Sequence, residues 1–399
     1  MKQQAARRIF IILFIAIFAA MLGLGIIGPL MPIYAKNLGA TGIWLGVIFS
    51  GFSLSRAIFM PIIGRISDRK GRKKFIVVGL FCYSVISLLY IQASNVWALS
   101  AIRFLHGFAS AMVIPIVMAY IGESSRKGHE GKRMGIFNIA FFLGMGSGPL
   151  LGGLIHDKLG FNAVFHTMTA LTAFAFLLTL IFLPDVNINI ERENHGKKHT
   201  MSIKKIFSTN IFKGLLIYRF INAMGRGGVL SFFPVLAAYL NISPSKIGLI
   251  LTTNIFLMAL LQGIFGYLAD KWNKFYMVII GSIIGSLALI LISLVKNFWS
   301  FLLLALVMGL GGAISMPAAT AINVRIGRRY GMGSSMGLFN TAMSIGMIIA
   351  PIISGLVMDY FGLKYIFYVS GGISLIGTFI FSYYLLIGQK SEVGQFYAN

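Results

Sequence analysis

The sequence predicts an all-α membrane protein with twelve transmembrane helices, arranged as two six-helix pseudo-symmetric halves. Three observations predict this fold class: the apolar composition, the spacing of long apolar runs, and a repeat that relates the halves. Of the 399 residues, 57% are hydrophobic and only 11% are charged. Ordinary water-soluble domains carry about 25% charged residues, so we expect much of this chain's surface to face lipid.

Runs of about twenty apolar residues, long enough to cross a hydrocarbon core of about 30 Å, recur along the chain. In the first half they lie near residues 9–34, 42–63, 75–94, 97–121, 134–156 and 163–183. In the second half they lie near residues 211–239, 247–269, 276–295, 298–323, 335–357 and 366–387. The first run is too long for the core of a signal peptide, so we interpret it as a span.

The loops between these runs are short, except for a polar segment of mixed charge at residues 184–210. We therefore expect an N-terminal six-helix bundle over 1–183, a cytoplasmic linker over 184–210 and a C-terminal six-helix bundle over 211–399. Lys and Arg near span ends stay on the cytoplasmic side. With both termini in the cytoplasm, 25 of the 34 basic residues are cytoplasmic and five are external. The expected location is the cell (inner or plasma) membrane, crossed many times.

The two halves align at one fixed offset of 202 residues. Matching pairs at this offset are Gly64 and Gly266, Asp68 and Asp270, Pro149 and Pro351, and the runs MGIFNIA at 134–140 and MGLFNTA at 336–342. Coincidences at one offset across separate loops indicate a duplicated six-helix unit. In parallel repeats of this kind the solute site lies between the halves near the bilayer midplane, so the architecture favours transport of a small molecule.

Residues 64–74 read GRISDRKGRKK, a short turn in which one carboxylate lies among six basic side chains. One interpretation is a basic anchor on the cytoplasmic side. The segment also resembles the signature loop of the major facilitator superfamily, G-x-x-x-D-x-x-G-R-[KR]-[KR], and that resemblance implies the major facilitator fold. It further implies that the loop residues set conformation rather than substrate choice: Gly64, Asp68, Arg69, Gly71, Arg72 and Lys73.

The stretch 103–123 resembles the fourth-helix motif of the same superfamily, with Arg103 and Gly107 at motif positions. An arginine within a span is costly, so Arg103 either has the functional role that the resemblance implies or snorkels to the outer interface. Glu123 ends this helix on the cytoplasmic side. It either pairs with the signature loop or is a solvated charge at a helix end.

The run GMGSGPLLGG at 144–153 resembles G-x-x-x-G-P-x-x-G-G, the pattern of the antiporter branch of this superfamily. The motif residues are Gly144, Gly148, Pro149, Gly152 and Gly153. Glycines four residues apart let helices approach closely, so close packing alone is the structural alternative. The branch most resembled is the twelve-helix drug:proton antiporters, which implies multidrug efflux in exchange for protons by a monomer.

The charges inside the spans depart from that branch, whose members usually carry an acidic residue within the membrane. All ten Asp and Glu residues lie in loops, at helix ends or in the tail, whereas Arg56, Arg103, Arg219 and Arg226 lie within spans. A desolvated cation needs a partner, and carbonyl groups, water, a loop acid or an anionic substrate are the open candidates. The structural alternatives are pairing with Asp68 for Arg56 and snorkelling to the cytoplasmic surface for Arg219.

Three in-span residues are candidates for the substrate or proton pathway: Arg103, His106 and Arg226. Arg226 lies deep in its span, beside glycines that can open space for a ligand. His106 follows Arg103 by one turn on the same helix face, and histidine titrates near neutral pH. A purely structural role is the alternative for His106.

These features predict a secondary active transporter that moves a small solute by alternating access, with proton-coupled efflux of a drug or metabolite as the main hypothesis. Uniport or symport of an organic anion or neutral metabolite is the alternative. A membrane enzyme acting on lipids is disfavoured, because the acids stand singly, and no GxxxxGK[ST] loop is present. With a single cysteine, Cys82, and no metal-ligand spacing, no cofactor or metal is expected. The expected partners are the bilayer, the substrate and protons, and no nucleic acid.

Overall fold

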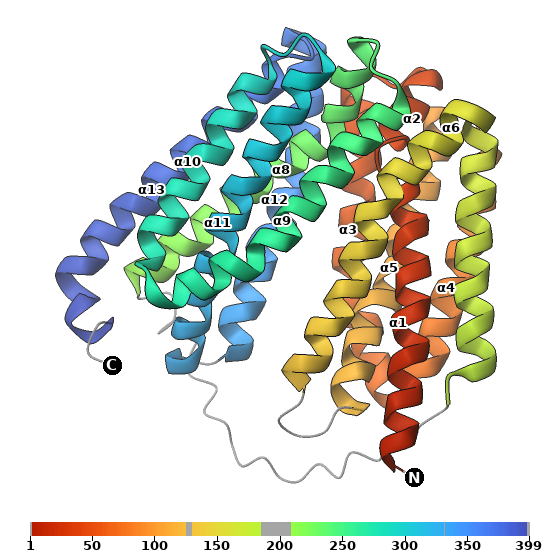
Figure 1. The fold of residues 1–399 in the computed structure, drawn as a ribbon, viewed down its shortest axis with the longest axis horizontal. Coiled ribbons are helices and arrows are strands. Elements are labelled where there is room, and N and C mark those ends of the chain that lie inside the picture. Colours follow the sequence, from red (N-terminus) through yellow and green to blue (C-terminus); the bar gives the residue numbers. More distant parts are fainter. Residues whose placement is uncertain (1, 125–129, 185–208, 331, 397–399) are drawn as a thin grey trace. The chain divides into compact units, whose positions relative to one another are not determined.

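The fold is described from a computed structural model of the chain, which covers residues 2–124, 130–184, 209–330 and 332–396 (Figure 1). Within these residues every regular element is an α-helix. Most of the predicted linker, residues 185–208, lies outside the described part of the chain.

The first half of the chain forms α1 (Lys2–Ile27), α2 (Met31–Asn37), α3 (Gly42–Lys70), α4 (Arg72–Ile91), α5 (Val96–Ser124) and α6 (Glu130–Phe182). The predicted first run, residues 9–34, is divided between α1 and the short α2. The division falls at Gly28 and Pro29, where proline removes a backbone donor and disfavours helix at the residue before it.

The 53-residue helix α6 is two spans joined at one residue. Gly160 has φ 76° and ψ −176°, a conformation outside the helical region. At 1.5 Å per residue the apolar part, Ile136–Phe182, would be about 70 Å long if straight, more than twice a hydrocarbon core. The break at Gly160 therefore separates two membrane-length helices, as the runs 134–156 and 163–183 predict. Glycine adopts this positive φ without the strain that a Cβ would add.

The second half of the chain forms α8 (Asn210–Tyr239), α9 (Pro244–Lys271), α10 (Lys274–Ile292), α11 (Phe298–Tyr330), α12 (Met332–Phe361) and α13 (Tyr365–Phe396). Across the described residues eleven helical stretches are long and apolar enough to cross a membrane. Because one of them is the broken α6, the described chain contains twelve spans. The predicted all-α membrane fold with twelve transmembrane helices is confirmed.

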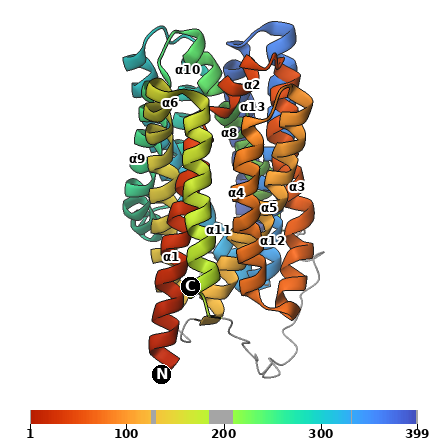
Figure 2. The same cartoon turned by 90° about the vertical axis from the view of Figure 1, so that its right-hand side faces the viewer.

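The chain divides into two compact units. The first comprises residues 1–190 together with 233–256, and the second comprises 191–232 together with 257–399. Within the first unit α1 packs along α6, while α5 lies against both α3 and α4 (Figures 1 and 2). Within the second unit α10 packs along α11 and α13. The division into bundles over 1–183 and 211–399, joined by a linker over 184–210, stays a prediction.

The repeat found in the sequence also governs the packing inside each unit. A Cβ placed on Gly79 of α4 would lie 2.7 Å from the side chain of Val113 on α5. A Cβ placed on Gly281 of α10 would lie 2.7 Å from the backbone nitrogen of Ser315 on α11. Glycine and partner both shift by 202 residues between these two contacts, so the duplicated unit keeps the same helix crossing.

Candidate functional site

The signature segment is almost entirely helical, which differs from the short turn expected. Helix α3 continues to Lys70 and α4 begins at Arg72, so Gly71 alone joins them, with φ 91° and ψ 149°. Arg72 Nη1 donates a 2.6 Å hydrogen bond to Ser67 Oγ, which donates to the Gly64 carbonyl at 2.7 Å. The joint is thus fixed by a glycine conformation and by one arginine that reaches back across it.

The structure describes only part of the predicted contact between the signature loop and Glu123. Arg69 is exposed and Lys73 is half-buried, and a Cβ on Gly64 would meet no described atom within 4 Å. The side chains of Asp68 and Glu123, the acids at the two ends of this arrangement, lie outside the described part of the chain. Whether Glu123 pairs with the signature loop or is a solvated charge at a helix end stays a prediction.

One face of the antiporter segment packs on α1 through bare backbone. A Cβ on Gly144 would lie 2.6 Å from the Phe18 carbonyl oxygen, and a Cβ on Gly148 would lie 2.5 Å from the Cα of Gly25. A Cβ on Gly152 would overlap the backbone carbonyl of Ile26, the next residue of α1. Spacing of four residues places these glycines in one row, so the row sets the closest approach of α6 to α1.

The opposite face of the same segment packs on the start of α9, which belongs to the same unit. A Cβ on Gly153 would overlap the backbone of Pro244, and a Cβ on Gly248 would overlap that of Pro149. The backbone N–H of Leu150 donates to Thr252 Oγ1 at 3.2 Å. At its glycines the antiporter segment therefore contacts α1 on one side and α9 on the other directly through backbone atoms.

The second half contains a copy of the α1–α6 contact. A Cβ on Gly346 of α12 would lie 2.5 Å from the carbonyl oxygen of Phe220 on α8, the counterpart of Gly144 and Phe18 at the 202-residue offset. Further along, the first copy keeps glycine where the second carries Ala350 and Ser354. The complete row of glycines toward α1 is thus specific to the first copy.

Arg103 of α5 lies among aromatic rings. Its side chain is 8% exposed, and its Cζ lies 4.6 Å from the ring centroid of Phe52 and 5.3 Å from that of Phe49, both on α3. Contacts of this kind stabilise a buried guanidinium by about 2 kcal/mol. The burial of Arg103 does not support the snorkelling alternative. One turn on, Gly107 is required because a Cβ there would overlap the Phe52 carbonyl.

His106 is fully buried in the first unit and is held by a tyrosine of α4. Its Nδ1 lies 2.8 Å from the hydroxyl oxygen of Tyr90. The ring packs edge-on against Phe52 and Tyr83, with centroids 5.5 Å and 5.0 Å apart. Its Nε2 has no hydrogen-bond partner among the described residues. The imidazole therefore keeps one free position inside the protein.

Three further hydroxyls are buried near His106, which the sequence did not reveal. Those of Tyr83 and Ser110 face each other without a well-formed hydrogen bond, and that of Ser55 is buried without a partner in the described structure. Buried polar groups are nearly always paired, with protein or with ordered water. The cluster is therefore suited to hold water or a polar ligand group. A signal was available, because Tyr83 and Tyr90 lie seven residues apart on one face of an otherwise apolar helix.

Arg219 of α8, in the second unit, is buried against sulfur. Its side chain is 6% exposed, Nη1 lies 2.9 Å from Met316 Sδ, and Nη2 lies 2.7 Å from Met343 Sδ. Its Cζ stands 4.6 Å from the ring centroid of Phe339. The side chain packs inside the unit, so the structure does not support snorkelling to the cytoplasmic surface.

Arg226 lies two turns further along α8 and is half-buried. Its Nη2 lies 3.2 Å from Met258 Sδ on α9 and faces Gly312 on α11. Of the three predicted pathway residues, Arg103 and His106 belong to the first unit and Arg226 belongs to the second. Among the described residues no three His, Cys, Asp or Glu side chains lie close enough to hold a metal ion.

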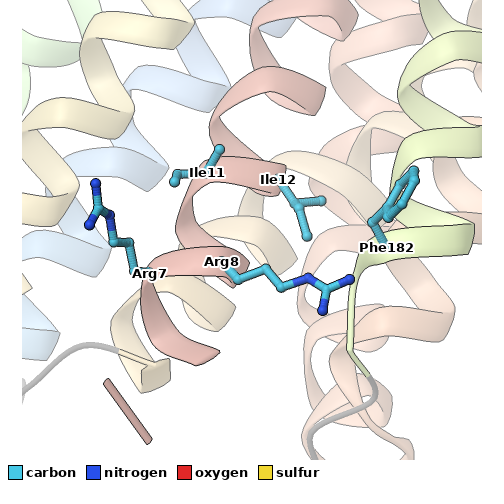
Figure 3. A pocket seen from close by; sticks show the side chains of 5 residues that line it. All are labelled: Arg7, Arg8, Ile11, Ile12 and Phe182. Atoms are coloured by element: carbon cyan, nitrogen blue, oxygen red, sulfur yellow. The ribbon is translucent and has the colours of Figure 1, made fainter. Parts of the chain in front are cut away.

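A hollow of about 310 Å³ lies at the N-terminal end of α1. Its lining residues are Arg7, Arg8, Ile11, Ile12 and Phe182. Figure 3 shows the two guanidinium groups on opposite sides of α1, with that of Arg8 toward Phe182. No predicted pathway residue lines this hollow.

Comparison with known proteins identifies the family. Residues 13–220 and 215–395 each match the profile of the Major Facilitator Superfamily. An uncharacterized MFS-type transporter of Methanocaldococcus jannaschii is 34% identical over 372 residues, which cover 93% of this chain and 96% of that protein. Quinolone resistance protein NorA of Staphylococcus aureus is 29% identical over 389 residues, covering 94% and 95% respectively.

A solved structure supports the fold independently. The nucleoside transporter NupG superposes with a TM-score of 0.79 at 14% identity, covering 94% of this chain and 99% of that one. At this identity the likeness concerns the fold alone. Because the family profile matches nearly the whole length, the chain belongs to the Major Facilitator Superfamily: it is a multi-pass membrane transporter of small molecules and not an enzyme.

Proposed function

We propose that this secondary transporter is an exporter that exchanges a drug or metabolite for protons by alternating access. The observation that carries the proposal is the glycine seam of α6, residues 144–153, packed on α1 and on α9. The similarity to NorA, a protein named for quinolone resistance, supports the same class of substrate. Both termini are proposed to lie in the cytoplasm of a cell-membrane protein, from the distribution of basic residues.

The seam supports exchange because an exchanger must not leak protons. Water conducts protons wherever it forms a continuous file, and it cannot enter between helices whose backbones touch. Gly148 against Gly25 and Gly248 against Pro149 are contacts of that kind. A tightly packed helix junction at this point favours a transporter in which flux of the solute and flux of the proton stay coupled.

His106 is the proposed proton-binding group. No carboxylate lies within the described spans away from a helix end, and the free Nε2 of His106 is a buried site that can take up a proton. The groups around it are Tyr83 and Tyr90 of α4, Phe52 of α3 and Arg103 of α5. Because Arg103 is positively charged, protonation of His106 requires water or an anion to enter the cluster. That requirement links proton uptake to ligand occupancy.

Uniport or symport of an organic anion or a neutral metabolite is the second candidate. It is favoured by the buried arginines, of which Arg219 and Arg226 contact thioether sulfur and no acid among the described residues. In that case the positive interior would attract the solute directly, and no proton would be needed to balance its charge.

Transport by the purified full-length protein in proteoliposomes distinguishes these candidates. A pH gradient is imposed so that the liposome interior is either acidic or alkaline relative to the outside. Uptake of anionic, neutral and cationic fluorescent compounds is then followed. Proton exchange predicts uptake that follows the gradient and reverses when the gradient is reversed. Flux that ignores the gradient overturns the proton-coupled proposal and supports uniport.

A further inference from the structure

Two arginines on one face of α8 form an unbalanced cluster of positive charge in the second unit. Arg219 and Arg226 are seven residues apart, two turns of helix, and both point toward methionines of neighbouring helices. Neither guanidinium contacts a carboxylate among the described residues. The methionine cluster consists of Met258, Met316 and Met343.

The partners of these guanidiniums are weaker than the groups that normally balance a buried cation. An arginine offers five N–H donors, and thioether sulfur is a poor acceptor. In the described structure Arg219 Nε is buried with no partner. A buried charge is costly unless it is paired and hydrogen-bonded. The cluster therefore has unused donor capacity and a positive potential that an anion would relieve.

The two arginines differ in accessibility, and the difference divides their roles. Arg219 is 6% exposed and is enclosed by Met316, Met343 and the ring of Phe339. Arg226 is half-buried, and its Nη2 lies beside Gly312, where a Cβ would stand 3.5 Å away at an ordinary contact distance. Part of the Arg226 side chain is thus exposed to an incoming group, while Arg219 adds its charge from the buried side.

We propose that Arg226, supported by the charge of Arg219, binds the anionic group of an amphipathic organic anion. The anionic group is a carboxylate or sulfonate, which matches the planar guanidinium fork. Its flat apolar body lies against the half-buried methionines of this cluster, because thioether side chains adapt to varied apolar shapes. This inference rests on the proposed function in one respect, the transport of small organic solutes, and it adds their charge class.

An inorganic anion is disfavoured as the ligand. Sulfate and phosphate are strongly hydrated, and thioether and phenyl groups would replace none of the hydrogen bonds lost with that water. An organic anion instead gains from burial of its apolar part, about 25 cal/mol per Å². The surroundings of Arg226 therefore select for the combination of charge and apolar surface.

The inference is tested by isothermal titration calorimetry, which measures ligand binding to the purified full-length protein in detergent. The ligands are naphthoate, its neutral amide, the matching naphthylmethylammonium cation, and inorganic sulfate. Wild-type protein is expected to bind naphthoate at least about tenfold more tightly than the amide, and to bind neither the cation nor sulfate measurably. Equal affinity for naphthoate and the amide overturns the inference, as does tight binding of sulfate alone.

Three variants locate the site. Arg226→Met is expected to lower naphthoate affinity at least about tenfold and to leave amide affinity unchanged. Arg226→Lys keeps the charge but loses the fork, so it should fall between wild type and Arg226→Met. Lys213→Met removes a cation from the same helix at its start and serves as the control, with naphthoate affinity retained. A melting temperature close to wild type shows that Arg226→Met is folded, and unchanged naphthoate affinity in that variant overturns the inference.

The inference and the proposed function fail separately. Charge-selective binding lost in Arg226→Met, together with flux that ignores the pH gradient, upholds the anion site and overturns proton exchange. Gradient-driven flux of a compound whose binding is indifferent to Arg226→Met and to ligand charge upholds the proposed function and overturns the anion site.

Discussion

The hydroxyl of Tyr90 lies 2.8 Å from Nδ1 of His106, and the backbone carbonyl of the same tyrosine accepts a 2.8 Å hydrogen bond from Tyr34. One residue at the end of α4 thereby connects the short helix α2 with the buried imidazole of α5. No acid lies near His106 in the described structure, so this hydrogen bond and the packing on Phe52 and Tyr83 together orient the ring, with Nε2 left free.

Replacing His106 tests its proposed role in proton coupling. His106→Gln keeps a hydrogen-bonding side chain beside Tyr90 but cannot bind a proton near neutral pH. We expect flux driven by a pH gradient to fall by more than about tenfold, with solute binding retained. The measurement is gradient-driven uptake in proteoliposomes beside calorimetric binding. The companion variant Tyr90→Phe keeps the imidazole and frees its Nδ1, so it should lower flux less. Undiminished gradient-driven flux in His106→Gln would rule out this role.

A methyl group within the glycine seam should separate α6 from α1. Gly148→Ala places a Cβ 2.5 Å from the Cα of Gly25, a contact that only helix displacement can relieve. The expected loss of stability is about 1–3 kcal/mol, measured as a lower melting temperature in detergent. Gly51→Ala on α3, where a Cβ meets no described atom within 4 Å, is the matched control. It should be neutral or stabilising by up to about 1 kcal/mol, and equal effects at both sites would contradict the close contact.

The repeated contact predicts paired effects in the two units. Gly144→Ala and Gly346→Ala each direct a Cβ at a carbonyl oxygen, of Phe18 and of Phe220. Both variants should lower the melting temperature by similar amounts, and the double variant should show additive losses because the sites lie in separate units. A large effect at one site and none at the other would show that the duplicated crossing no longer has the same mechanical role.

The joint between α3 and α4 should depend on glycine at position 71. With φ at 91°, Gly71→Ala introduces strain of about 1–2 kcal/mol. It also disturbs the hydrogen bond from Arg72 to Ser67 across the joint. The expected result is a lower melting temperature. Gly64→Ala, at a helical position of the same segment with open space around it, should not lower the melting temperature. A stable Gly71→Ala protein would mean that the joint relaxes to another backbone conformation.

Tyr34 should contribute stability that disappears at alkaline pH. Burial raises the pKa of the Tyr34 hydroxyl above its ordinary value of 10.0, and in its neutral form it donates to the carbonyls of Tyr90 and Ala93. The folded-state pKa is the higher one, so this contribution is complete below pH 10 and is lost as pH rises through the raised pKa. Tyr34→Phe should therefore cost about 1 kcal/mol at neutral pH and show a smaller fall in melting temperature above pH 10. An identical alkaline profile in both proteins would contradict the assignment.

The sequence predicted the number and type of spans because apolar runs and membrane thickness determine them together. It did not predict where the helices end. Helix α3 continues past its apolar run to Lys70, and α11 continues to Tyr330, because the Arg and Lys residues that follow the runs are good helix formers. The break at Gly28 and Pro29 lay inside a run that hydropathy alone treats as continuous.

The sequence predicted those residues of the candidate site that are unusual in themselves, such as a charged residue within an apolar span, but not the residues that surround them. Buried arginines stand out in an apolar span, so Arg103 and Arg226 were identified. The partners of Arg219 were not, because methionine is an ordinary apolar residue in a membrane helix and Met316 and Met343 lie 97 and 124 residues away along the chain. Contacts at that separation depend on the tertiary packing of α8, α11 and α12.

Gly71 is the only residue between α3 and α4, and Gly160 is the only non-helical residue between the two parts of α6. A single residue has two rotatable backbone bonds, too few to absorb a displacement of several ångströms in a helix of membrane length. Helices α3 and α4 therefore cannot move apart at this end, and neither can the two parts of α6. Any change in the angle between the joined helices has to be absorbed by φ and ψ of one glycine, which lacks a Cβ and so allows a wide range of both.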